Sequence, residues 1–127
     1  MGKNGYKDLM VWQKARDLAV LVYSITNQSK FKKDYGLCDQ IRRAAVSVAS
    51  NIAEGDERDT DKESVRFFFI AKGSLAELRT QIDIAYQVGY IDEKVFVDVE
   101  EKATQIGKML GALIKSRTQV KSFSTHL

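Results

Sequence analysis

The chain of 127 residues contains no proline, one cysteine and one histidine. Proline breaks helices more strongly than any other residue, so its absence permits long helices anywhere in the chain. The single Cys38 excludes an internal disulfide, and its apolar neighbours at helical spacing favour a small core residue. His126 is the penultimate residue, which disfavours any catalysis that needs a positioned histidine.

Long apolar runs and an export signal are also missing. The longest apolar run, Leu18–Tyr23, has six residues, far short of the roughly 20 residues that cross a bilayer. The first residues lack the apolar stretch of a signal peptide, so we expect a cytoplasmic protein. With 44% hydrophobic and 29% charged residues, the composition is that of an ordinary soluble domain.

The familiar motifs of enzyme chemistry do not occur. The chain has no Glu-x-x-His pair for a di-iron bundle, no phosphate-binding loop and no dinucleotide motif. We therefore expect no metal, no cofactor, no small-molecule substrate and no catalytic residues. The remaining enzymatic alternative is a hydrolase that uses carboxylates alone, drawn from Glu54, Glu77 and Asp83.

Apolar residues recur at steps of three and four along most of the chain, which is the pattern of amphipathic helices. This periodicity predicts helices at about 8–27, 37–54, 61–88 and 93–117. Asp8, Thr60 and Asp92 are the expected N-caps, and Gly55 and Gly89 are expected just past helix ends. Short loops make neighbouring helices antiparallel, so residues 1–118 should form one up-down-up-down four-helix bundle, followed by a flexible tail at 119–127.

The third predicted helix carries more apolar surface than one core can cover. Phe67–Ala71 spans five consecutive positions, and consecutive residues point in different directions around a helix. We expect Phe67, Phe69 and Ile70 to face a second copy of the chain. The alternative is that a loop or the tail covers them. Gly73 in the same helix costs about 1 kcal/mol relative to alanine, which suggests that something packs close to the backbone there.

Charge is segregated along the chain. Residues 1–50 carry a net +5, residues 51–101 a net −7 and residues 102–127 a net +5. Many of these charges suit helix ends, where acidic groups stabilise N-termini and basic groups C-termini. That explanation fails for one basic cluster at the start of the second predicted helix, which is the best candidate for phosphate contacts. The cluster consists of Lys30, Lys32, Lys33, Arg42 and Arg43.

Three segments carry a family resemblance. Residues 8–15 read DLMVWQKA, residues 40–55 read QIRRAAVSVASNIAEG, with Arg58 following, and residues 71–78 read AKGSLAEL. In this order they resemble the ribosomal-RNA intervening-sequence protein family over about residues 6–118. The resemblance implies a small bacterial four-helix bundle that forms a ring-shaped homopentamer. It also implies a relation to the accessory protein of diversity-generating retroelements, which binds nucleic acid and a reverse transcriptase.

Carried onto this chain, the resemblance implies a structural role for Asn51, Glu54 and Gly55 at the turn between the second and third helices, with Arg58 as an ion partner. The leading hypothesis is a non-enzymatic homo-oligomer that binds RNA or a ribonucleoprotein through the basic cluster. The alternative is a protein-interaction scaffold that makes no direct contact with nucleic acid, in which segregated charge fixes the orientation of a protein partner.

Overall fold

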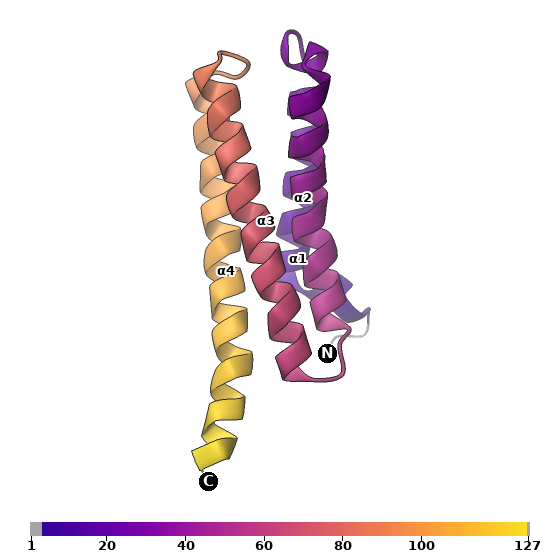
Figure 1. Cartoon of the computed structure of the whole chain (residues 1–127), viewed down its shortest axis with the longest axis vertical. Helices are drawn as coiled ribbons and strands as arrows, with labels where there is room; N and C mark the ends of the chain where they lie inside the picture. The colour runs from indigo at the N-terminus through magenta and orange to yellow at the C-terminus, as the bar shows by residue number, and fades with distance from the viewer. Residues whose placement is uncertain (1–3, 127) are drawn as a thin grey trace.

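The structure of the protein, a computed structural model, describes the backbone of residues 4–126 and the side chains of residues 4–118. It confirms the predicted all-α four-helix bundle, and the described residues contain no strand. The helices run alternately up and down (Figure 1). They are α1 (Met10–Thr26), α2 (Tyr35–Asp56), α3 (Asp61–Gln87) and α4 (Glu93–His126), and two short 3-10 helices lie at Gly5–Asp8 and Phe31–Lys33.

The core lies along the axis between the four helices. α1 packs against α2 and α4, and α3 packs against other sides of the same two helices. Each helix contributes one stripe of apolar side chains, as the periodicity predicts. The largest fully buried side chains include Leu18, Val22, Ile41, Ile52, Phe68, Leu78, Ile82, Ile106 and Leu110.

Two predicted N-caps are correct and one is wrong. The Thr60 hydroxyl accepts the backbone N–H of Glu63 at 3.2 Å, and Asp92 accepts that of Val95 at 2.9 Å. Asp8 does not cap α1. It ends the short helix Gly5–Asp8, and its carboxylate accepts the N–H of Asn4 at 3.1 Å, while Leu9 takes the cap position with extended backbone.

The bounds of all four helices differ from the prediction, and α1 is shorter at both ends than the predicted 8–27. α2 begins at Tyr35 because the Asp34 carboxylate caps it, accepting the N–H of Leu37 at 3.1 Å. α3 ends at Gln87, and Gly89 follows with a φ of 86°, the left-handed conformation expected there. α4 continues past residue 117 to His126, through a stretch without glycine or proline. The predicted tail 119–127 lies outside the described side chains, and its last residue lies outside the described backbone.

Gly55 is not a residue beyond a helix end, because α2 continues through it to Asp56. A Cβ built on Gly55 would lie 2.6 Å from Cε1 of Phe68 and 3.0 Å from the carbonyl oxygen of Ser64. The Phe68 ring is fully buried. Glycine is therefore needed here so that α3 can place this ring directly against the backbone of α2.

We expect Gly55→Ala to lower the free energy of unfolding by about 1–3 kcal/mol, because the added methyl group overpacks a fixed aromatic ring. Urea denaturation at equal protein concentration measures it. The matched control is Gly111→Ala in α4, where an added Cβ meets nothing within 4 Å, and which should gain up to about 1 kcal/mol from helix propensity. Equal effects of the two substitutions would contradict this account.

Candidate functional site

Three of the predicted phosphate-binding residues lie on the connection between α1 and α2. We call residues 28–34 the lysine loop. The side chains of Lys30, Lys32 and Lys33 are exposed, and none of them takes part in an ion pair within the described part of the chain. Three uncompensated cations within four residues make this the most concentrated positive charge on the connections between helices.

The lysine loop is anchored to the bundle rather than free. The Phe31 ring is fully buried and stacks on Tyr90, with ring centroids 5.2 Å apart. The Sγ atom of Cys38 lies 3.0 Å from the carbonyl oxygen of Phe31. Burial raises the pKa of the Cys38 thiol, so it stays protonated and donates to this carbonyl.

A second contact joins the lysine loop to the α3–α4 connection. The Tyr90 hydroxyl donates to Oδ2 of Asp34 at 2.9 Å, and Oδ1 of the same carboxylate caps α2. The hydrogen bond to Asp34 raises the pKa of Tyr90, and burial adds to the effect. Sequence analysis missed this contact because the two residues are 56 positions apart.

The two predicted arginines share a surface depression with Tyr23, Asp39, Val46 and Ser47, but both are engaged. Nε of Arg42 donates to the Thr26 hydroxyl at 2.9 Å, and its guanidinium lies 4.9 Å from the ring centroid of Tyr23. Arg43 pairs with Asp39 at 2.9 Å. Within the predicted cluster, the positive charges without an ion partner in the described chain are therefore those of the lysine loop and of Arg42. The hydrogen bond to Thr26 holds Arg42 in place, and the Asp39 carboxylate neutralises the charge of Arg43.

The four residues expected at the α2–α3 turn have separate roles. Arg58 pairs with Glu54 one helical turn away, and Gly55 receives Phe68. Asn51 lies inside α2, where its Nδ2 donates to the carbonyl oxygen of Ser47 at 2.9 Å. The Ser47 hydroxyl is 2.9 Å from that of Ser74, so this polar group links α2 to α3 rather than forming the turn.

The three predicted interface residues on α3 differ in how far they are covered. Phe69 is 54% exposed and Ile70 is 43% exposed. Phe67 is half-buried, and the Arg58 guanidinium lies 4.5 Å from its ring centroid. Phe69 and Ile70 are thus left without cover within the described chain, whereas Phe67 already has a partner.

The carboxylates of the enzymatic alternative do not converge. Glu54, Glu77 and Asp83 are all exposed, and Glu54 is paired with Arg58. Glu77 and Asp83 are six residues apart on α3, which places them about 120° apart around the helix. Within the described residues, no cluster of three or more His, Cys, Asp or Glu side chains could hold a metal ion.

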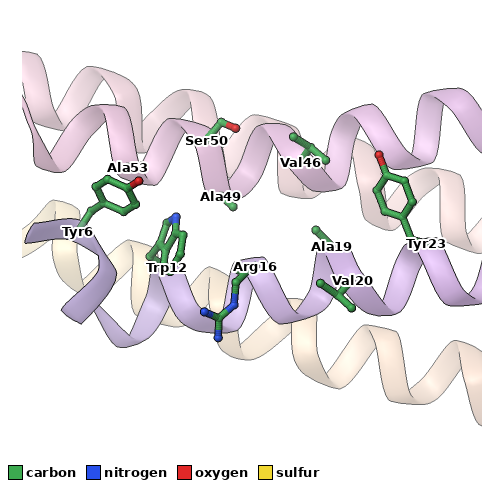
Figure 2. Close-up of a pocket in the computed structure, with 10 residues that line it drawn as sticks. All are labelled: Tyr6, Trp12, Arg16, Ala19, Val20, Tyr23, Val46, Ala49, Ser50 and Ala53. Atoms are coloured by element: carbon green, nitrogen blue, oxygen red, sulfur yellow. The ribbon is translucent and has the colours of Figure 1, made fainter. Parts of the chain in front are cut away.

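A second surface feature was not predicted. An apolar groove of about 460 Å³ runs between α1 and α2, with Tyr6 and Trp12 at one end and Tyr23 at the other (Figure 2). We call it the α1–α2 groove. It is lined by Tyr6, Trp12, Arg16, Ala19, Val20, Tyr23, Val46, Ala49, Ser50 and Ala53.

A signal for the α1–α2 groove was present in the sequence. Val20 and Val46 fall outside the apolar stripes of their helices, and they are 64% and 42% exposed. Apolar residues on the outer faces of two adjacent helices indicate a surface that a partner covers. Trp12, by contrast, fits the core stripe, so periodicity alone does not show that it also borders a groove.

The comparison with protein families identifies the chain. A profile described as 23S rRNA-intervening sequence protein matches residues 7–112. The chain belongs to the 23S rRNA-intervening sequence protein family. The match spans all three quoted segments and the lysine loop, and it confirms the family that they suggested.

A solved structure supports the fold. It is the 1.70 Å crystal structure of a protein of unknown function from the S23 ribosomal protein family of Bacteroides thetaiotaomicron. Its TM-score is 0.77 at 22% sequence identity, and the match covers 84% of this chain and 99% of that one. The search of curated proteins finds no match. No helix in the described part of this family member is both long and apolar enough to cross a membrane.

The Tyr90–Asp34 contact gives a pH-dependent prediction. The hydrogen bond exists only while the phenol is protonated, so its stabilisation should be complete below about pH 10, the ordinary tyrosine pKa, and lost as pH rises through the raised pKa of Tyr90. We expect Tyr90→Phe to remove a tyrosinate step above the ordinary tyrosine pKa from an ultraviolet titration and to flatten the alkaline fall in melting temperature. The control Tyr35→Phe removes an exposed phenol and should leave that fall unchanged. An alkaline fall in melting temperature that Tyr90→Phe leaves as steep as in the wild type would contradict the contact.

Proposed function

We propose that this protein is a non-enzymatic, self-associating helical bundle that binds RNA, alone or in a ribonucleoprotein, through the lysine loop. The observation that carries the proposal is the exposure of Lys30, Lys32 and Lys33 without ion partners in the described structure, on a loop that Phe31 anchors. An anchored loop holds its cations in place, so binding phosphates costs less conformational entropy than it would on a mobile loop. Membership of a family named for ribosomal RNA insertions agrees with this partner.

Self-association strengthens this proposal. Each copy supplies one lysine loop and one Arg42, which is a modest set of phosphate contacts. Joining several copies makes the later contacts intramolecular, so weak contacts add up to useful affinity. The exposed Phe69 and Ile70 support this assembly.

A protein-interaction scaffold is the second candidate, and the α1–α2 groove favours it. An apolar groove suits a protein helix better than a nucleic acid, because buried base edges need polar partners that most of its lining lacks. Recovery of a single stoichiometric protein partner from nuclease-treated lysate, and its loss on Val46→Glu, would favour this reading over RNA binding.

Binding of a fluorescein-labelled RNA hairpin, followed by anisotropy, tests the RNA proposal. We expect binding at about 50 mM salt that weakens steeply as salt rises to about 200 mM. The triple variant Lys30→Ala, Lys32→Ala, Lys33→Ala should lose most of the affinity and reduce the salt slope by roughly 0.7–0.9 for each lysine that contacts a phosphate.

The matched control removes the same charge elsewhere. Lys62, Lys108 and Lys115 are exposed and lie on α3 and α4, and their replacement by alanine should leave the salt slope nearly unchanged. Absence of binding at about 50 mM salt, or an equal loss in both triple variants, would refute binding through the lysine loop.

A further inference from the structure

The outer face of α3 carries a narrow apolar stripe that nothing in the described chain covers. Its members recur at steps of three and four residues, so they share one side of the helix. Phe69 is 54% exposed and Ile84 is 47% exposed. We call this the α3 stripe, and it consists of Phe69, Gly73, Ala76, Thr80 and Ile84, all of which are exposed.

Gly73 lies within the α3 stripe. A glycine inside a helix costs about 1 kcal/mol relative to alanine. At position 55 this cost has an explanation, because a Cβ there would collide with Phe68. At position 73 it has none within the described chain, because a Cβ on Gly73 would have no neighbouring atom within 4 Å. The predicted close packing at Gly73 is therefore absent within the described chain. A bare backbone between larger apolar residues permits the close approach of a helix from outside.

The α1–α2 groove has the shape that such a helix needs. Its floor contains the small residues Ala19, Ala49 and Ala53. The groove continues into the depression beside Arg42 and Arg43, because Tyr23 and Val46 line both. The two together follow α2 from Ala53 to Asp39. This length is about 21 Å and the α3 stripe is about 22 Å long, at about 1.5 Å per residue.

Charges of both signs border the two surfaces. Arg16 lines the groove, and Arg42, Arg43 and Asp39 line the depression that continues it. Glu77 and Asp83 flank the α3 stripe on either side, with Lys72 and Arg79 on the Asp83 side and Arg66 at the N-terminal end of the stripe. Arg16 and Arg43 now pair with Asp17 and Asp39 at the surface. Exposed pairs of this kind are weak, so a partner's carboxylates can replace them.

We propose that the α3 stripe of one copy docks in the α1–α2 groove of a second copy. The inference rests on the self-association part of the proposed function and does not depend on RNA binding. It assigns a use to Gly73 and to the exposed Val20 and Val46.

The two surfaces lie on different helices, so one contact joins two copies head-to-tail unless both contacts close within the same pair. A copy that inserts its α3 stripe into a neighbour keeps its own α1–α2 groove open for a third copy. Contacts of this type produce a closed ring where the rotation closes and a filament where it does not. A symmetric groove-to-groove pair would stop at a dimer.

Two glutamate substitutions separate these arrangements. Gly73→Glu blocks the stripe, and because glutamate is a better helix former than glycine, the fold should survive. Val46→Glu blocks the groove at an exposed position. By light scattering at micromolar concentration, we expect wild type to give a multiple of the 14.3 kDa chain mass and each variant alone to give a monomer.

Mixing the two variants is the decisive measurement. The groove of Gly73→Glu and the stripe of Val46→Glu are both intact, so one productive contact remains and the mixture should form a dimer that grows no further. The control Val97→Glu changes an exposed valine on α4 outside both surfaces and should keep the wild-type mass. Circular dichroism checks that every variant is folded.

Each other outcome has a defined meaning. A mixture that stays monomeric overturns head-to-tail docking. A wild-type mass for Gly73→Glu with a monomeric Val46→Glu indicates groove-to-groove pairing and overturns the proposal. Monomeric wild type refutes self-association itself, whereas a wild type that assembles unaffected by either substitution refutes only this pairing. RNA anisotropy is measured separately, so its result does not decide among these outcomes.

Discussion

The close approach of Phe68 to Gly55 is the contact on which the rest of the bundle depends. It fixes both the distance of α3 from α2 and the rotation of α3 about its own axis. Arg117 of α4 reinforces the same corner, since its guanidinium lies 5.4 Å from the Phe68 ring and 3.3 Å from the buried Asp56 carboxylate. Because adjacent residues point about 100° apart on a helix, burying Phe68 leaves Phe69 exposed. The apolar outer surface of α3 is thus a geometric consequence of core packing.

Sequence periodicity was enough to identify the four helices and their antiparallel order, because each helix buries one continuous stripe and no proline interrupts it. Caps formed by residues three positions apart, such as Thr60 with the Glu63 amide, were also predictable. The start of α2 was missed although its cap, Asp34 with the Leu37 amide, is equally local. The sequence could not show that Tyr90, 56 positions away, also holds Asp34, because contacts between distant positions leave no periodic trace. The reason for Gly55 was missed similarly, since it depends on a ring contributed by the next helix.

The candidate site could also be predicted from the sequence only in part. The lysines could be identified from the sequence because the separation of charge is local. Whether the arginines are free to bind a partner could not be predicted, because Arg42 donates a hydrogen bond to Thr26 of α1 and Arg43 pairs with Asp39. The α1–α2 groove exists only once two outer faces lie side by side, although Val20 and Val46 hinted at it individually. A cluster of charges close together in the sequence could therefore be predicted for this chain, whereas a surface formed by two helices could be predicted only in part.

The up-and-down order of the helices also bears on how the chain folds. Each helix packs on the one that follows it, and the connections between them are short. Bundles dominated by such local contacts have low contact order and fold in microseconds to milliseconds. We therefore expect this chain to fold on that timescale, because the helices that form each outer surface are neighbours in the sequence.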